Sequence, residues 1–255
     1  MTSLHILTGA SRGLGAAMAE QLLGTDTTLL CISRHVNVML ASKAEDAPAK
    51  LEQWSRDLSD PLPVARQIES WLHMFDAAQF DSAVLINNAG VITRIGPVDA
   101  GGDEELSSAL RVGLEAAMLL TRAFLRATGD WRARREGACK VLNISSGLGR
   151  RAMAGSAVYC AAKAGMDHYS RAVALDEAHR GHAARIVSLA PGVIDTDMQA
   201  TLRAADAGGF PEQGKFVELR ASGQLLSPQD AAARVLAYLR REDFGANPVA
   251  DVRDS

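Results

Sequence analysis

Short apolar segments alternate with longer helical segments along this chain, and this alternation limits its possible folds more than any other feature. Five segments have the length and composition of buried strands, at residues 4–8, 27–33, 84–87, 140–144 and 185–189. Helical patterns lie at residues 16–23, near 104–127 and near 157–179. Strands connected through helices pair in parallel by right-handed crossovers, with helices on both faces of the sheet. The pattern therefore predicts a doubly wound α/β fold.

We expect residues 1–255 to form a single domain. The length of 255 residues suits one large α/β domain, and no internal repeat, low-complexity segment or linker divides the chain. The segment 195–227 interrupts the strand rhythm, because it is polar and rich in Gly and Ala. We interpret it as an insertion over the sheet, either a surface excursion or a substrate lid. The segment 35–51 is compatible with a loop or a helix.

Composition and charge argue against several classes of function. The net charge of −3 gives no basic surface for nucleic acid, and 47% hydrophobic with 22% charged residues is typical of a globular protein. The three cysteines show no C-x-x-C spacing, which argues against a disulfide framework or a zinc site and fits a reducing cytoplasm. No apolar run reaches the roughly 18 residues needed to span a membrane. A strand pattern at the N-terminus leaves no room for a signal peptide. We expect a cytoplasmic protein without a metal site.

A glycine-rich turn connects the first strand to the first helix. The segment 8–15 reads TGASRGLG. Glycines at such a turn allow the backbone to approach a pyrophosphate, which then lies at the N-terminus of the helix. The position of the turn in a strand–turn–helix unit makes a dinucleotide site the favoured interpretation over a turn without a ligand. The predicted contacts are Gly9, Ser11, Arg12, Gly13, Leu14 and Gly15.

The end of the second strand predicts which nicotinamide cofactor is used. An acidic residue there would bind the ribose 2′-hydroxyl, whereas Arg accommodates a 2′-phosphate. This chain has Ser33 and Arg34, and Arg12 of the glycine turn lies within reach of the same place. Two cations and a hydroxyl suit a phosphate. We therefore expect NADPH rather than NADH.

Tyr159 and Lys163 are candidates for proton transfer. They are four residues apart in a predicted helix, so they lie on one face of it. A neighbouring ammonium group favours the phenolate and is expected to lower the pKa of Tyr159 from about 10. A Tyr tuned in this way can exchange a proton near neutral pH. Ser146 lies thirteen residues before Tyr159.

Taken together, these motifs resemble the short-chain dehydrogenase/reductase family along nearly the whole chain. The order and spacing agree for TGASRGLG (8–15), Asp57-Leu58, Asn87-Asn88-Ala89-Gly90, NISS (143–146), the Tyr159/Lys163 pair and PGVIDT (191–196). The resemblance implies a single Rossmann domain with a mostly parallel, seven-stranded sheet. In detail the chain is most similar to the benzil reductase and sepiapterin reductase branch, through LINNAGVITRIGPV (85–98), APGVIDTDMQA (190–200) and FVELRASGQLLSP (216–228).

The resemblance also implies roles for particular residues. It makes Ser146, rather than Ser145, the catalytic serine beside Tyr159 and Lys163. It places Asp57 and Leu58 at the adenine. It places the segment 87–90 on the adenosine ribose side, where it also stabilises the central sheet, with the predicted cofactor contacts Asn88, Ala89 and Gly90. It places the nicotinamide carboxamide against the segment 191–196, with the predicted contacts Pro191, Gly192, Val193 and Thr196.

One position departs from the family pattern. Many members carry an Asn in a Val-Asn-Leu string as a fourth catalytic residue, and here the string is Val112-Gly113-Leu114. The resemblance implies a proton-relay water held by the backbone carbonyl at this position, and Gly retains that carbonyl. We hypothesise that the relay is kept through the backbone at Gly113, which requires the helix to be distorted there.

The expected function is reduction of a ketone or diketone by NADPH, as in benzil and sepiapterin reductases. Alternatives within enzymes are a 3-oxoacyl-thioester reductase and a hydroxysteroid-type dehydrogenase. An alternative of another class is an NADP(H)-sensing protein without catalysis.

Substrate contacts are expected from the segment 195–227 and from Leu148, Met153, Val193 and Met198. The resemblance further implies a homodimer or homotetramer that packs through the two long helices, where Ala161, Ala164 and Ala172 permit close approach.

Overall fold

The computed structural model describes residues 2–46, 49–135 and 137–254. Within these residues, one sheet of seven parallel strands has the order β3-β2-β1-β4-β5-β6-β7. The strands are β1 (Ser3–Thr8), β2 (Thr27–Ser33), β3 (Lys50–Ser55), β4 (Ser82–Asn87), β5 (Cys139–Ile144), β6 (Arg185–Ala190) and β7 (Val249–Asp251). The strand order reverses between β1 and β4, which opens a crevice at the carboxyl ends of these strands. The predicted doubly wound, seven-stranded sheet is confirmed.

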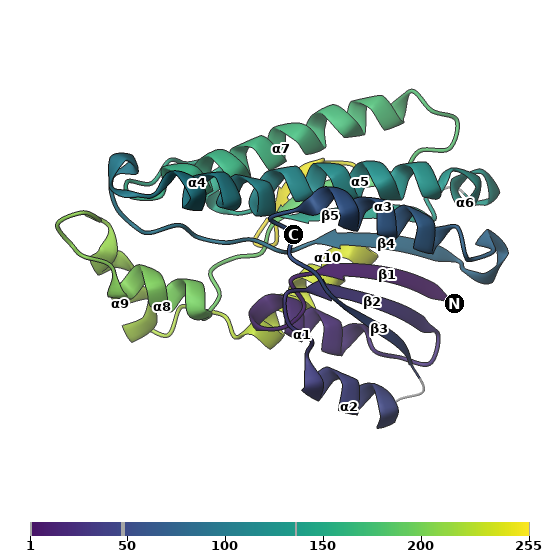
Figure 1. Cartoon of the computed structure of the whole chain (residues 1–255), viewed down its shortest axis with the longest axis horizontal. Helices are drawn as coiled ribbons and strands as arrows, with labels where there is room; N and C mark the ends of the chain where they lie inside the picture. The colour runs from purple at the N-terminus through teal and green to yellow at the C-terminus, as the bar shows by residue number, and fades with distance from the viewer. Residues whose placement is uncertain (1, 47–48, 136, 255) are drawn as a thin grey trace.

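Helices cover both faces of the sheet (Figure 1). One face carries α1 (Gly13–Leu22), α2 (Val38–Asp46) and α10 (Pro228–Arg240). The other carries α3 (Pro61–Leu72), α5 (Ala116–Ala127), α6 (Gly129–Arg134) and α7 (Ala157–Ala178). The helix α4 (Asp103–Leu110) precedes α5. Short 3-10 turns are η1 (Ala77–Gln79), η2 (Val98–Ala100) and η4 (Gly147–Gly149).

Each face of the sheet has its own apolar core, because neighbouring residues of a strand point to opposite faces. Leu7 of β1 packs in the cluster that includes Met18 of α1 and Val235 of α10. Its neighbour Ile6 packs in the opposite cluster with Phe124 of α5. Strands buried on both faces are apolar at almost every position, which is why five of them could be recognised from the sequence.

The strands β3 and β7 do not appear among those five segments. β3 lies at the edge of the sheet, and each of its residues is exposed or half-buried, so it contains no buried apolar run. β7 has only three residues. The ambiguous segment 35–51 contains the helix α2 and ends in the first two residues of β3, while its residues 47–48 lie outside the described residues. The first helix begins at Gly13, three residues before the predicted Ala16. The prediction began too late because Gly13 and Gly15 are weak helix formers, so the first turn has no helical pattern in the sequence.

The long helix predicted near residues 104–127 is divided. A π-helical turn, η3 (Arg111–Glu115), separates α4 from α5, with the amide of Ala116 donating to the carbonyl of Arg111. Such π-turns break the regular hydrogen bonding of a helix and are frequent at functional sites. Gly113 lies at the middle of this turn, so the distortion that our hypothesis requires is present.

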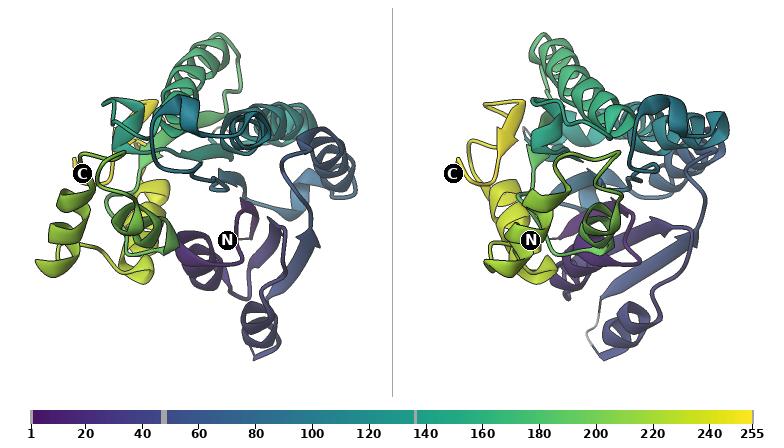
Figure 2. Two further views of the ribbon diagram at one scale, coloured as in Figure 1. Left: turned by 60° about the vertical axis from the view of Figure 1, so that its left-hand side comes forward. Right: turned by 90° about the vertical axis from the view of Figure 1, so that its left-hand side faces the viewer.

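The segment 195–227, interpreted from the sequence as an insertion over the sheet, contains two helices. It contains α8 (Asp197–Ala204) and α9 (Gln213–Ala221), beyond the carboxyl ends of the strands (Figure 2). The two ends of the segment are joined by a parallel bridge between Ile194 and Leu226. A third apolar cluster, centred on Met153, Leu202 and Phe210, packs under the two helices. Within the described part of the chain, the helices lack the combination of length and apolarity that crossing a bilayer requires.

Candidate active site

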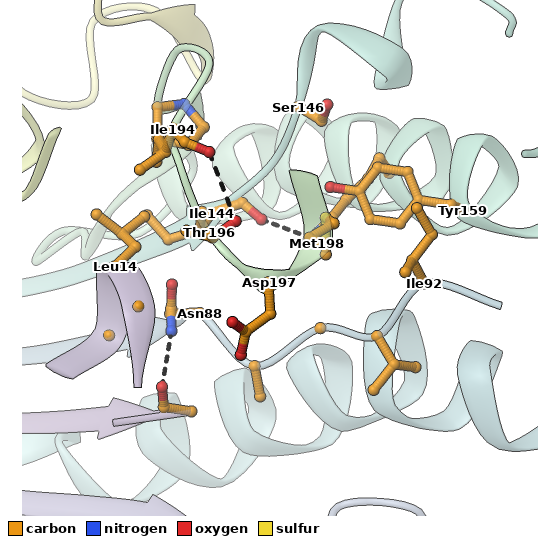
Figure 3. Close-up of a pocket in the computed structure, with 18 of the residues that line it drawn as sticks. Leu14, Asn88, Ile92, Ile144, Ser146, Tyr159, Ile194, Thr196, Asp197 and Met198 are labelled. Atoms are coloured by element: carbon orange, nitrogen blue, oxygen red, sulfur yellow. Dashed lines mark hydrogen bonds between the residues drawn. The ribbon is translucent and has the colours of Figure 1, made fainter. Parts of the chain in front are cut away.

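A cavity of about 850 Å³ opens at the carboxyl ends of β1, β2, β4, β5 and β6. All the cofactor-binding and catalytic residues expected from the sequence line it, although they come from segments far apart in the chain. Figure 3 shows Leu14 and Asn88 at one end and Tyr159 and Ile92 at the other. The lining includes Gly9, Ser11, Arg12, Gly13, Leu14, Gly15, Ser33, Arg34, Asp57, Leu58, Asn88, Ala89, Gly90, Ser146, Tyr159, Lys163, Pro191, Gly192, Val193 and Thr196.

The glycine turn has a shape that side chains would prevent. Gly9 and Gly13 have φ angles of 70° and 55°, in the left-handed region that favours glycine. A Cβ atom on Gly15 would lie 2.0 Å from the carbonyl oxygen of Gly9. The backbone of the turn is therefore folded tightly on itself. This leaves an open concave surface of backbone at the N-terminus of α1, where phosphate groups bind.

Asn88 fixes this turn to the end of β4. Its Nδ2 atom donates to the carbonyl oxygens of Thr8 (3.0 Å) and Gly9 (3.2 Å), while the Thr8 hydroxyl accepts from the amides of Asn88 and Ala89 (both 3.0 Å). The first strand, the glycine turn and the end of β4 are thus one hydrogen-bonded unit. The segment 87–90 supports the sheet, as the resemblance implied, and it also shapes the turn.

The end of β2 is rich in cations. Arg34 is exposed there, close enough to lower the pKa of Asp57, although the main cause of that lowering is a hydrogen bond from the amide of Ser59. Arg56, which directly follows β3, lines the same end of the cavity and was not among the contacts predicted from the sequence. Arg12 is turned toward α8, where its guanidinium lies 2.8 Å from a carboxylate oxygen of Asp197. Among these three cations, Arg34 and Arg56 are the ones at the strand ends.

Ser146, Tyr159 and Lys163 meet at the other end of the cavity. Ser146 follows β5, and Tyr159 and Lys163 lie one turn apart on α7. The ammonium group of Lys163 lies 5.7 Å from the centre of the Tyr159 ring and donates to the carbonyl oxygen of Ile144 at 2.7 Å. Lys163 is only 3% exposed. A hydroxyl, a phenol and a buried cation therefore face one space.

The expected effect of Lys163 on Tyr159 is not seen. Burial raises the pKa of Tyr159 above its usual value, and a hydrogen bond with Ser146 opposes this only in part. The reason is geometric, because the ammonium lies over the ring and is bonded to Ile144 rather than to the phenol oxygen. Burial also lowers the pKa of Lys163 to about 8, an effect that the charge of Asp167 opposes. Tyr159 is therefore held as the protonated phenol, the form that donates a proton.

Gly113 packs directly behind this group. It is buried, and a Cβ atom there would lie 3.3 Å from the Cβ of Ala162, which neighbours Lys163 on α7. This distance is tighter than most Cβ contacts, so the π-turn and α7 approach each other closely because position 113 is a glycine.

The sequence of this chain matches a family model. Residues 4–207 fit the model described as short chain dehydrogenase, which is most of the chain. The chain belongs to the short-chain dehydrogenase family. It is accordingly an oxidoreductase of the kind that interconverts carbonyl and alcohol groups, and the cavity is the candidate active site of a short-chain dehydrogenase.

Similar family members include reductases of several substrates. The chain is 34% identical to the benzil reductase ((S)-benzoin forming) of Bacillus cereus, over 94% of each chain. It is 30% identical to the 3-oxoacyl-[acyl-carrier-protein] reductase of Salmonella typhimurium, over 94% of this chain and 90% of that one. It is 28% identical to the sepiapterin reductase of Rattus norvegicus, over 98% of this chain and 95% of that one.

Solved structures agree with this fold. A short-chain dehydrogenase/reductase from Burkholderia vietnamiensis is 36% identical, with a TM-score of 0.66 and coverage of 99% of this chain and 97% of that one. A metagenomic short-chain oxidoreductase in complex with NADP is 25% identical, with a TM-score of 0.69 and coverage of 98% and 94%.

The cavity wall of this short-chain dehydrogenase includes residues that the sequence did not identify one by one. Beside Leu148, Met153, Val193 and Met198, which were expected near the substrate, the wall includes Ile92, Arg151, Leu202, Phe216 and Arg253. Leu202 and Phe216 lie on α8 and α9, within the segment 195–227 that was expected to contact the substrate, and Ile92 lies in the string 85–98. The folding of α8 and α9 over the strand ends brings Leu202 and Phe216 to the cavity. Arg151 and Arg253 lie in loops and had no signal in the sequence. The wall around Tyr159 is therefore mainly apolar, with Arg151 at its edge.

Proposed function

We propose that this short-chain dehydrogenase is an NADPH-dependent carbonyl reductase that acts on ketones or diketones. The observation that carries the proposal is the convergence of Ser146, Tyr159 and Lys163 at one end of a cavity whose other end is the glycine turn. A cavity of about 850 Å³ has room for a dinucleotide and a small substrate together. The Rossmann crevice provides the place, and the three side chains provide the proton chemistry.

The residues present fit a nicotinamide dinucleotide. Cβ atoms on Gly9 and Gly15 would lie 2.9 Å from Cα of Ala89 and 2.0 Å from the carbonyl oxygen of Gly9, respectively, so these glycines permit the tight backbone turn that the pyrophosphate of such a cofactor requires. Arg34 and Arg56 at the ends of β2 and β3 supply positive charge for a 2′-phosphate, and Arg12 lies nearby. A structural relative that is 25% identical holds NADP. These observations support NADPH over NADH. The reduced nicotinamide would supply the hydride.

Each catalytic side chain has a separate task in the proposed reduction. Tyr159 donates its proton to the carbonyl oxygen of the substrate as the carbon accepts the hydride. Ser146 donates a hydrogen bond to the same oxygen and so stabilises the negative charge that develops there. Lys163 supplies a positive charge that stabilises the phenolate left on Tyr159 after proton transfer. The backbone of the π-turn at Gly113 is proposed to hold the water through which the proton is replaced.

The wall of the cavity favours an apolar carbonyl substrate. Ile92, Leu148, Met153 and Leu202 contribute to one apolar cluster beside Tyr159. The similarity to the benzil reductase of Bacillus cereus points in the same direction. We therefore place aromatic diketones first among the candidate substrates, with the segment 195–227 acting as the substrate loop of the single domain.

Removal of the Tyr159 hydroxyl tests the proposal. We expect Tyr159→Phe to reduce kcat for diketone reduction by roughly 100-fold or more, because the proton donor is lost. The Kd for NADPH, measured by fluorescence titration, should change by less than about threefold, because the ring and Lys163 remain. Persistent activity in this variant would overturn the mechanism.

A panel of substrates separates the candidate functions. Wild-type protein is assayed for NADPH oxidation with an aromatic diketone, a pterin, a hydroxysteroid pair and a 3-oxoacyl thioester. The highest kcat/KM with the diketone supports the proposal, and the highest value with the thioester or the steroid supports the corresponding alternative. Tight NADPH binding without turnover of any carbonyl compound would support an NADP(H)-sensing protein instead.

We further propose that the protein forms a homodimer or homotetramer through α4, α5 and α7. We also propose that it resides in a reducing cytoplasm. Ala161, Ala164 and Ala172 are exposed on α7, and Leu175 is 66% exposed on the same helix. These small and apolar side chains would allow a close helical interface. The three cysteines are free, as a reducing compartment would leave them. Light scattering after size-exclusion chromatography measures the oligomeric state.

A further inference from the structure

The face of α7 that carries Tyr159 and Lys163 continues to a third polar residue. Asp167 lies four residues beyond Lys163, so it is one helical turn further along the same face. It is 1% exposed. A carboxylate is rarely buried to this degree unless its charge is balanced and its oxygens are hydrogen-bonded. The partners of Asp167 therefore indicate what its charge does.

Two serine hydroxyls hold one carboxylate oxygen of Asp167. The Oγ atoms of Ser145 and Ser188 both donate to Oδ1, at 2.6 Å each. Ser145 directly follows β5 and directly precedes Ser146, while Ser188 lies in β6. The carboxylate thus connects α7 to the ends of two adjacent strands. One of these connections fixes the residue next to the proposed catalytic serine.

The second carboxylate oxygen faces the η4 turn. Oδ2 lies 3.2 Å from Nε of Arg150, whose side chain is 31% exposed. A Cβ atom on Gly149 would lie 2.8 Å from Oδ2 and 2.9 Å from the carbonyl oxygen of Lys163. Only glycine therefore allows the turn to lie this close to α7. Arg150 also donates to the carbonyl oxygen of Ala250 in β7.

We propose that Asp167 is a positioning residue for the proposed reduction: its buried carboxylate keeps the Lys163 ammonium charged and fixes the end of β5 that carries Ser146. The inference rests on the proposed function for its role in catalysis. The contacts themselves are independent of the substrate, because they lie behind Lys163 and not in the space that faces Tyr159.

The balance of charges explains why Lys163 needs this partner. Burial alone disfavours the ammonium, and within the described residues its hydrogen-bond acceptor is the carbonyl of Ile144. The titratable and charged groups around it are Tyr159 and Asp167 on α7 and Arg150, which directly follows η4. A second carboxylate, Asp251 of β7, lies 3.9 Å from Nη1 of Arg150 and is paired with Arg253 at 2.6 Å, so Asp167 is the carboxylate whose charge acts on Lys163. Without it, the ammonium would lose its proton at a lower pH.

The test follows the protonation of Lys163 directly. The chain contains five lysines, so ¹³C-lysine labelling gives a simple NMR spectrum in which Lys163 is assigned by its absence in Lys163→Arg. We expect Asp167→Asn to move the titration midpoint of Lys163 down by about one pH unit or more. Asp167→Glu should restore it in large part. An unchanged midpoint in Asp167→Asn would overturn the proposal.

Glu177→Gln is the matched control. Glu177 is also a buried carboxylate of α7, 2% exposed, but it is paired with Arg132 and lies ten residues beyond Asp167. Its loss should destabilise the protein without moving the Lys163 midpoint. An equal shift in both variants would overturn the proposal.

If Asp167→Asn does not fold, Arg150→Gln serves in its place. This substitution removes the cation that shares the carboxylate of Asp167 with Lys163. The titration midpoint of Lys163 should therefore rise, and a constant or lower midpoint would contradict the inference.

Kinetics provide the second measurement. In the reduction direction, activity should decline at high pH as Lys163 loses its proton, and this decline should occur at a lower pH in Asp167→Asn than in wild type. The kcat value should fall more than KM rises, because Asp167 does not face the substrate. A wild-type protein that reduces no carbonyl compound would overturn the proposed function, while the NMR titration would still decide whether Asp167 controls Lys163.

Discussion

At the scale of single residues, the three arginines at the cofactor end have different surroundings. Arg12 is bound to Asp197 of α8, so a phosphate would have to compete with a carboxylate for it. Arg34 lines the cavity close to Asp57, and its backbone carbonyl is fixed by the hydroxyl of Ser55 at 2.8 Å. Arg34 is therefore the residue from which we expect the strongest discrimination between the two nicotinamide cofactors.

Arg34→Ala tests this discrimination. We expect the Kd for NADPH to rise roughly tenfold, because one hydrogen bond to a charged group contributes about 1.5–3 kcal/mol. The Kd for NADH should change by less than about twofold. Arg126→Ala is the control, since Arg126 is an exposed arginine paired with Glu69 away from the cavity. Fluorescence titration with both cofactors measures the effect, and equal losses for NADPH and NADH would contradict the assignment.

At the scale of elements, α8 and α9 form a unit with its own small core. Their ends are joined by the Ile194–Leu226 bridge, and Phe210 between them is fully buried and stacks against Phe216 at 5.6 Å. This cluster is separate from the two cores that flank the sheet. The unit can therefore loosen without unfolding of the sheet, which is the property that a substrate loop needs.

Phe210→Ala should loosen this unit selectively. Loss of a buried Phe costs about 3–5 kcal/mol, and here the loss falls on the small cluster. We expect hydrogen exchange of amides in α8 and α9 to accelerate by at least about tenfold, while amides in β4 and β5 remain protected. Phe244→Ala removes a Phe that is 1% exposed in a main core, so it should accelerate exchange across the sheet. Identical exchange patterns in the two variants would argue against a separate unit.

At the scale of the whole molecule, a buried histidine makes stability depend on pH. His5 of β1 is 8% exposed, and burial, with a smaller contribution from Arg240, lowers its pKa to about 4. The unfolded chain binds the proton near the ordinary pKa of 6.5, before the native protein does. The stability that neutral His5 provides is therefore complete above about pH 6.5 and is lost as the pH falls toward 4.

His5→Gln should weaken this pH dependence. Between pH 7 and pH 5, we expect the free energy of unfolding of the wild type to fall by about 2 kcal/mol more than that of the variant. Urea unfolding at the two pH values measures the difference. His168→Gln is the control, because His168 is exposed on α7 and should behave as the wild type does. A variant that loses as much stability as the wild type would show that other groups cause the acid sensitivity.

The sequence by itself determined the parts of the molecule whose physics is local. Buried strands of a parallel sheet are apolar on both faces, so β1, β2, β4, β5 and β6 could be recognised as runs, and the glycine turn could be recognised because only glycine permits its backbone. The family motifs then indicated Ser146, Tyr159 and Lys163 before any contact was known. The edge strand β3 and the short β7 lack such a local signal, because pairing in the sheet forms them.

Only the tertiary structure decided how the charges act on one another. Sequence spacing placed Lys163 beside Tyr159, but the direction of the ammonium toward Ile144, and the dominance of burial over its charge, depend on how α7 packs against β5. The same is true of Asp167, whose role emerges from Ser145, Ser188 and Arg150, three residues on other elements. Electrostatic effects depend on distance and burial, which spacing along a helix fixes only within that helix. For this reason the sequence indicated which residues form the site, and the packing of α7 on the sheet determined their protonation.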